Sequence, residues 1–221
     1  MMICMNSCAQ ELSLHYIVKQ PTVKTENPPI LILLHGIGSS EEDLFSFAPS
    51  LPGKYLVVSA RAPITLSGTS FAWYKMQMSG GKIIYEQEQE KSSRELLVKF
   101  ISEIKTKYNL KNSEVYLCGF SQGAIMSYSV ALTHPDLVNG IAVMSGRLLE
   151  EIKPEIASKA KLKNLKIYIA HGKKDTVLPF QNAVEANAFL QTLSLQPTFN
   201  QYDEAHIISA EMLRDLVDWL K

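Results

Sequence analysis

The chain has 221 residues, with 22 Lys and Arg against 22 Asp and Glu, so its formal net charge at pH 7 is zero. This balance excludes the strongly basic character typical of proteins that bind nucleic acid or an anionic membrane surface. With 46% hydrophobic and 20% charged residues, the composition is that of a folded globular protein rather than a disordered one. We expect one domain over residues 1–221, with residues 1–11 flexible.

The first half of the chain shows strand and helix patterns in alternation. In chain order, it predicts a short alternating strand at 12–18, a buried strand at 30–34, a helix from 40 to about 51, and a buried strand at 55–60. The run ILILL at 30–34 follows two prolines and has no polar alternation, which indicates a strand buried on both faces. A stripe of apolar residues at spacings of three and four predicts a helix at 86–108.

Residues 61–82 separate these elements and have no clear period. Their apolar content, which includes Phe71, Trp73 and Tyr74, argues against disorder. We expect this segment to be a long loop that builds an apolar pocket.

The second half of the chain continues the alternation. It predicts strands at 115–118, 140–144, 165–170 and 198–202, and helices at 123–132, 180–193 and 209–220. Strands that alternate with helices of ten or more residues are typical of a parallel α/β sheet covered by helices on both faces. In such sheets, ligands bind at the carboxyl ends of the strands, so the catalytic residues are expected there.

A Gly-x-Ser-x-Gly sequence lies between the predicted strand at 115–118 and the helix that follows it. It is formed by Gly119, Ser121 and Gly123 with two intervening residues. In this context the pattern indicates a nucleophile elbow, a tight turn that exposes a serine hydroxyl at the edge of the sheet. The sequence therefore predicts Ser121 as a nucleophile.

A serine nucleophile needs a base, and five histidines compete for that role. In α/β-hydrolases the order along the chain is serine, then acid, then histidine, which favours His206 in the loop before the last helix. His15 and His35 precede the serine, His134 is explained as a helix C-cap, and His171 by turn and core packing.

The acid that orients this base is expected after the strand at 165–170. Asp175 lies four residues beyond the end of that strand and before a helix that a proline precedes. Asp203 and Glu204 are rivals, but both adjoin His206 in sequence. We therefore favour Asp175.

Two backbone N–H groups are needed to hold a negatively charged oxygen in the reaction. One is expected from Gln122, directly after the nucleophile, and the other from the loop after the strand at 30–34. That loop reads His35-Gly36-Ile37-Gly38, and its glycines allow the backbone to approach an oxyanion closely.

The segments LILLHGIGSSEEDL, CGFSQGA, AHGKKDTVLP and DEAHII together resemble the carboxylesterase/phospholipase family of α/β-hydrolases. This family includes small bacterial carboxylesterases and acyl-protein thioesterases. The resemblance implies an α/β-hydrolase fold with a mostly parallel sheet and no large lid domain. It also implies roles for five residues: Ser121 as nucleophile, Asp175 as orienting acid, His206 as base, and the amides of Ile37 and Gln122 as oxyanion donors.

The resemblance places Trp73 beside the active site. We expect Trp73, Tyr74 and Leu178 to bind the substrate, with Trp73 only partly buried. Relatives often carry an acidic residue two positions after this tryptophan, whereas this chain has Lys75. The substrate of those relatives is therefore not carried over.

These inferences predict a serine carboxylesterase that hydrolyses short- to medium-chain esters through an acyl-enzyme, with no cofactor and no metal. The alternatives are an acyl-protein thioesterase, a lysophospholipase, or a non-catalytic binding protein with a hydrolase fold. The expected partner is a small ester or thioester. The sequence leaves open the acyl length, the physiological substrate, and whether the protein is a monomer or a homodimer.

The cysteines and the apolar runs bear on location. Cys4, Cys8 and Cys118 cannot form a disulfide framework, and the first two have no further ligands for a zinc site. Reduced thiols favour a cytoplasmic protein. No apolar run reaches 18 residues, and the first residues lack the basic and apolar regions of a signal peptide, so we expect no membrane insertion.

Overall fold

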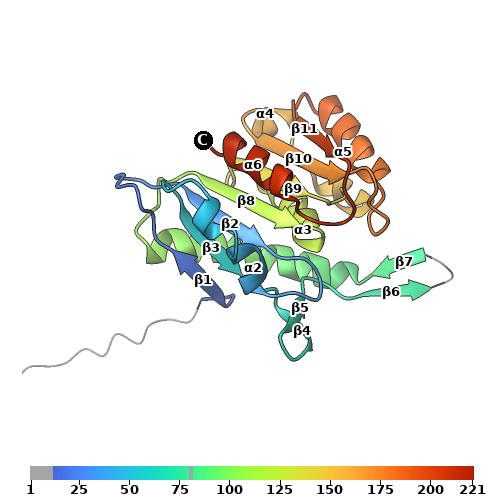
Figure 1. Ribbon diagram of the computed structural model, residues 1–221, viewed down its shortest axis with the longest axis horizontal. Coiled ribbons are helices and arrows are strands. Elements are labelled where there is room, and N and C mark those ends of the chain that lie inside the picture. Colours follow the sequence, from blue (N-terminus) through green and yellow to red (C-terminus); the bar gives the residue numbers. More distant parts are fainter. Residues whose placement is uncertain (1–11, 80–81) are drawn as a thin grey trace, which may run out of the picture.

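The computed structural model describes residues 12–79 and 82–221. The expectation that residues 1–11 are flexible falls outside the described residues, as do Cys4 and Cys8. A seven-stranded sheet in the order β1-β3-β2-β8-β9-β10-β11 forms the centre of the fold (Figure 1). Its strands are β1 (Tyr16–Lys19), β2 (Ile30–Leu34), β3 (Leu56–Ala60), β8 (Val115–Phe120), β9 (Gly140–Met144), β10 (Lys166–Gly172) and β11 (Thr198–Tyr202). Only β1 runs antiparallel to its neighbour within this sheet.

Helices cover both faces of this sheet. The α-helices are α1 (Glu41–Phe45), α2 (Gln87–Lys107), α3 (Gln122–Thr133), α4 (Lys159–Leu162), α5 (Gln181–Thr192) and α6 (Ala210–Trp219), and two 3₁₀ helices span Ala48–Ser50 and Glu150–Glu155. Successive strand residues point to opposite faces. Ile32 accordingly packs in a core cluster with α2, α3 and α5, whereas Leu31 and Leu33 pack with α1 and α6. The predicted parallel α/β sheet with helices on both faces is confirmed.

Two local predictions are wrong. The single helix expected from 40 to about 51 ends at Phe45 and is followed by the 3₁₀ turn Ala48–Ser50. Pro49 lies in that turn and has no amide hydrogen to continue an α-helix. The expected loop at 61–82 contains strands of two antiparallel hairpins, β4 (Ile64–Ser67) with β5 (Ser70–Ala72) and β6 (Met76–Ser79) with β7 (Lys82–Tyr85). Strands of three or four residues are too short to produce a recognisable period.

The order of the strands places the site. The chain passes from β2 to β3 on one side of β2, and later adds β8 on its other side. The carboxyl ends of β2 and β8 are adjacent, since Leu34 is in register with Gly119. A reversal of this kind opens a crevice at the carboxyl edge, between the loops that leave the two strands. The loop after β2 and the serine turn after β8 therefore meet there.

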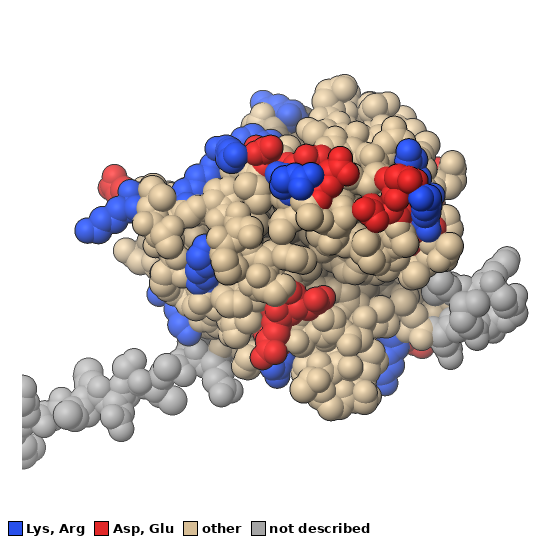
Figure 2. Space-filling model, viewed as in Figure 1, with Lys and Arg blue, Asp and Glu red and all other residues tan. Residues whose placement is uncertain are grey.

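The surface carries charges of both signs. Figure 2 shows basic and acidic side chains interspersed on the face in view, with no large area of it wholly basic. This agrees with the equal numbers of basic and acidic residues in the sequence. Among the helices of residues 12–79 and 82–221, none has the length and apolar character that crossing a membrane requires.

Candidate active site

Ser121 lies in the tight turn between β8 and α3. Its backbone has φ 52° and ψ −116°, a conformation that side-chain-bearing residues rarely adopt and that persists only where its surroundings enforce it. A Cβ atom at Gly119 would lie 2.3 Å from the Gly123 carbonyl oxygen, and one at Gly123 would lie 1.9 Å from the Leu34 carbonyl oxygen. Glycine is therefore required on both sides of Ser121 for the turn to pack against β2.

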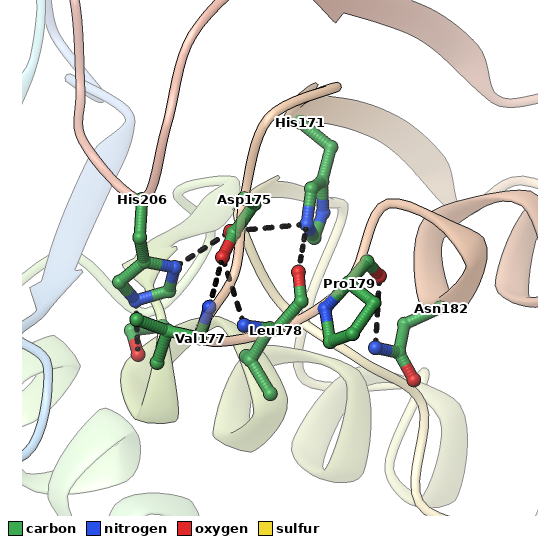
Figure 3. A network of polar contacts seen from close by, with 8 residues as sticks. His171, Asp175, Val177, Leu178, Pro179, Asn182 and His206 are labelled. Atoms are coloured by element: carbon green, nitrogen blue, oxygen red, sulfur yellow. Dashed lines mark hydrogen bonds and ion pairs between the residues drawn. The ribbon is translucent and has the colours of Figure 1, made fainter.

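A chain of hydrogen bonds joins Ser121, His206 and Asp175. His206 Nε2 lies 2.9 Å from Ser121 Oγ, and His206 Nδ1 lies 2.6 Å from Asp175 Oδ2. Figure 3 shows the imidazole of His206 turned toward the Asp175 carboxylate. Because a carboxylate only accepts, Nδ1 carries the imidazole proton, and the Nε2 lone pair faces the serine hydroxyl. The structure thus brings together the three residues that the sequence analysis selected.

The loops after β10 and β11 carry Asp175 and His206, and backbone hydrogen bonds join the two segments. Lys173 N–H donates to Tyr202 O at 2.7 Å, and Lys174 N–H donates to Glu204 O at 2.9 Å. The two loops also approach closely at Gly172, where a Cβ atom would lie 2.3 Å from Glu204 O. Two segments about 30 residues apart therefore deliver the acid and the base to one place.

The Asp175 carboxylate is held on both of its oxygens. Oδ1 accepts the backbone N–H of Val177 at 2.9 Å and of Leu178 at 2.8 Å, while Oδ2 faces His206. The side chain of Asp175 is completely buried. These bonds fix the carboxylate in the orientation that meets the imidazole.

The rival acid Asp203 lies elsewhere, in a surface ion pair with Lys174 at 2.8 Å. The hydrogen bond from Lys174 lowers the pKa of Asp203 below its ordinary value. Glu204 makes its contact with this region through its backbone, since its carbonyl accepts from Lys174 N–H. Of these carboxylates, Asp175 is the one that lies within hydrogen-bonding distance of the imidazole, with its Oδ2 2.6 Å from His206 Nδ1.

The backbone amides of Ile37, in the loop after β2, and of Gln122, the first residue of α3, lie on the two segments that meet at the carboxyl edge. Within residues 12–79 and 82–221, neither N–H has a hydrogen-bond acceptor in the protein, so both are available to a bound oxygen. The loop of Ile37 is fixed by two bonds to the next hairpin, Gly38 N–H to Phe71 O and Phe71 N–H to Ser39 O, both 2.9 Å long. Two backbone amides without an acceptor in the described part of the protein are candidate donors to a bound oxyanion.

The side chain of Gln122 has a structural role that the sequence analysis missed. Its Oε1 accepts from Trp73 N–H, and its Nε2 donates to Tyr74 O, each at 2.8 Å. The buried side-chain amide thus pairs with two backbone groups of another segment, as the backbone of a neighbouring β-strand would. It ties the first helical residue after Ser121 to the segment that holds Trp73.

The expectation that Trp73 is only partly buried is wrong, because Trp73 and Tyr74 are both 0% exposed. Trp73 Nε1–H instead donates to His35 O at 3.0 Å. His35 Nε2 accepts from Ala62 N–H, so Nδ1 carries the proton and donates to Gly36 O at 2.7 Å. Burial lowers the pKa of His35, which favours this neutral form. Trp73 therefore supports the loop of Ile37 from beneath and does not offer an open wall to a substrate.

We expect Trp73→Ala to lower the free energy of unfolding by about 3 to 5 kcal/mol, the usual cost of removing a fully buried large aromatic side chain. Trp73→Phe should cost less but should still leave the buried His35 carbonyl without its donor. Urea unfolding of both variants measures this, with Trp219→Phe as the control on half-buried α6 surface. A loss below about 1 kcal/mol for Trp73→Ala would contradict the burial on which this prediction rests.

Exposed apolar side chains lie close to Asp175 and His206 in sequence. Val177 is 57% exposed two residues after Asp175, and Ile207 is 48% exposed directly after His206. Leu178 is half-buried and packs against the core. Lys75 is exposed and lines a surface depression with α2 residues such as Gln89 and Leu96. Two exposed apolar side chains that the sequence analysis did not select, Val177 and Ile207, thus adjoin Asp175 and His206 in sequence.

No group of three or more histidine, cysteine, aspartate or glutamate side chains in the described ranges is arranged to hold a metal ion. Cys118 is a free, fully buried thiol on β8, and burial raises its pKa to about 12. It lies on the strand face that packs against α1 and α6.

A family model described as phospholipase/carboxylesterase matches residues 15–221. The esterase YpfH of Escherichia coli is 26% identical over 217 residues, which cover 94% of this chain and 87% of that protein. An acyl-protein thioesterase 1 of Kluyveromyces lactis is 31% identical over 135 residues, covering 59% of this chain and 58% of that protein. Two plant relatives, described as probable carboxylesterases, match over 41% of their own length.

Among solved structures, a carboxylesterase from Mesorhizobium loti superposes with a TM-score of 0.81 at 19% identity, covering 95% of both chains. At that identity the likeness establishes the fold.

Proposed function

Because this chain belongs to the phospholipase/carboxylesterase family, we propose that it hydrolyses carboxylic esters with Ser121 as nucleophile, His206 as base and Asp175 as orienting acid. The observation that carries the proposal is the continuous path from Ser121 Oγ through His206 to the buried Asp175 carboxylate. This arrangement supports acyl transfer, since each group has the partner that its role requires.

In the first half-reaction, His206 Nε2 accepts the hydroxyl proton while Ser121 Oγ attacks the carbonyl carbon of the ester. The resulting oxyanion lies between the N–H groups of Ile37 and Gln122, and donors of this type contribute about 3 kcal/mol each to the transition state. The C–O bond to the alcohol then breaks, and the imidazolium gives its proton to the departing oxygen. The products are an alcohol and an acyl ester of Ser121.

In the second half-reaction, the oxygen of a water molecule attacks the acyl carbon while His206 Nε2 takes a proton from that water. The same two amides hold the second oxyanion, and Ser121 leaves with the proton that His206 returns. The Asp175 carboxylate stays ionised and stabilises the imidazolium that forms twice in each cycle. The acid product departs, and the resting arrangement is restored.

A thioester substrate is a second candidate, because the Kluyveromyces lactis relative is described as an acyl-protein thioesterase. Oxygen esters and thioesters are hydrolysed by the same steps, so the triad serves both. An S-acylated peptide assayed beside an oxygen ester of the same acyl chain separates the two candidates by their kcat/KM ratio.

We expect kcat/KM for p-nitrophenyl esters to rise from the acetate, peak at short to medium acyl chains and fall for long ones. Exposed Val177 and Ile207 and half-buried Leu178 can cover only a few methylenes, and each fully buried methylene is worth at most about 0.8 kcal/mol. Leu178, Trp73 and Tyr74 were the substrate-binding residues expected from the sequence, and of these Leu178 keeps that proposed role.

The experiment compares wild type, Val177→Ser and Val23→Ser across the series. Val23 is a matched control, since it is 53% exposed but lies in the turn that bonds to Gly53, at the amino ends of the strands. Val177→Ser should flatten the dependence on chain length, and Val23→Ser should leave it unchanged. A rate independent of chain length in wild type would contradict an apolar acyl site.

A further inference from the structure

A second histidine lies against the Asp175 carboxylate. His171, near the end of β10, is 0% exposed, and its Nε2 lies 3.2 Å from Asp175 Oδ2 and 2.8 Å from Leu178 O. Figure 3 shows its ring on the opposite side of Asp175 from His206, directed at the Leu178 carbonyl. The mechanism above makes no use of this side chain, and the sequence suggested only turn and core packing for it.

The contacts of His171 fix its protonation. Both oxygens near Nε2 are acceptors, so Nε2 must carry a proton. Nδ1 is buried without a hydrogen-bond partner in the described part of the chain. A buried unpaired N–H is costly, which favours a bare lone pair at Nδ1 and hence a neutral ring. Burial also lowers the pKa of His171, in agreement with that form.

A neutral His171 completes the environment of the carboxylate. Asp175 Oδ1 accepts from the amides of Val177 and Leu178, and Oδ2 has His206 on one side and the His171 N–H on the other. The same N–H holds the Leu178 carbonyl, and thereby the turn whose amides grip Oδ1. His171 therefore acts on Asp175 by two routes, directly at Oδ2 and through the 177–178 turn at Oδ1.

We propose that His171 is a positioning residue, which keeps the Asp175 carboxylate aimed at His206 by holding the Leu178 carbonyl and facing Oδ2. The proposal rests on the proposed function, since Asp175 matters to catalysis only if His206 is the base. A positioning role predicts a lower kcat with a nearly constant KM, because the imidazole is misoriented while the substrate surface is untouched.

The test compares His171→Phe, His171→Gln and Tyr168→Phe with wild type, using one p-nitrophenyl ester and thermal unfolding. Phenylalanine keeps a ring and removes the N–H, whereas the longer amide of glutamine can restore a donor. Tyr168 is a matched control on the same strand, where its buried hydroxyl bonds to Tyr202 at 2.9 Å without touching the triad. We expect His171→Phe to lose about 10- to 100-fold in kcat, His171→Gln to recover most of it, and Tyr168→Phe to lose stability only.

Each outcome decides between positioning and packing. A kcat of His171→Phe within about twofold of wild type, or a glutamine variant as slow as the phenylalanine one, overturns the proposal. If His171→Phe does not fold, His171→Asn replaces it, since its shorter amide cannot reach both acceptors, and equal kcat values for the Asn and Gln variants then overturn it. A wild-type protein without ester turnover defeats the proposed function itself, whereas an active wild type with unaffected His171 variants defeats only this inference.

Discussion

Replacing Ser121 with alanine is expected to lower kcat for ester hydrolysis by about 10⁴- to 10⁶-fold. The alanine variant lacks the atom that forms the acyl-enzyme, although the two free amides and the substrate surface remain. Those remaining features account for the residual acceleration over water. Steady-state kinetics on a p-nitrophenyl ester measures the loss, with the protein shown to be free of contaminating esterases by active-site titration.

Ser127→Ala is the control for this substitution. Ser127 lies on α3, the helix that follows Ser121, and is completely buried. Its hydroxyl donates to the carbonyl of Gly123, four residues earlier. Its removal should leave kcat within about twofold and lower stability slightly, the usual effect of losing one intrahelical side-chain bond. An equal loss in both variants would mean that the Ser121 effect arises from misfolding of α3 rather than from lost chemistry.

Asp175→Asn should lower kcat by about 10⁴-fold while leaving the fold intact. The amides of Val177 and Leu178 still require an acceptor, so the asparagine oxygen takes the Oδ1 position and its NH₂ group faces His206 Nδ1. Nδ1 must then accept a hydrogen bond, which moves the imidazole proton to Nε2. With that proton in place, Nε2 cannot accept the proton of the Ser121 hydroxyl. The base is thus held in the wrong tautomer.

Asp203→Asn is the matched change for this test, because Asp203 was the rival acid and lies three residues before His206. Its carboxylate pairs with Lys174 at the surface, where exposed ion pairs contribute little. We expect its kcat to remain near that of wild type. A greater loss for Asp203→Asn than for Asp175→Asn would reverse the assignment of the acid.

The residues of the triad could be selected from the sequence because each follows a strand whose pattern is local. Ser121 is marked by glycines that the packing of β8, β2 and α3 requires, and Asp175 and His206 follow in the order that the fold imposes. The early end of the first helix could also have been predicted, since Pro49 lies inside the residue range that the sequence analysis gave to that helix. The strand patterns, the glycines beside Ser121 and Pro49 are signals from residues close together in the chain.

The burial and contacts of the residues around the triad could not be predicted from such local patterns. Buried Trp73 is hydrogen-bonded to Gln122 and His35, which lie 49 and 38 positions away in sequence. Residues 61–82 have no period to indicate which side chains face the core, because their strands are very short and project as hairpins (Figure 1). His171 looks like a turn residue until the loop after β10 folds back and brings Asp175 against its ring.

Labelling with a fluorophosphonate, followed by mass mapping of the modified peptide, tests the central claim most directly. The reagent reacts with a serine hydroxyl that a neighbouring base activates, so the label reports the nucleophile without knowledge of the substrate. We predict stoichiometric modification of Ser121, loss of ester hydrolysis in parallel, and no labelling of the Ser121→Ala variant. Modification of a different serine, or full ester turnover by a protein whose Ser121 has reacted, would contradict the account.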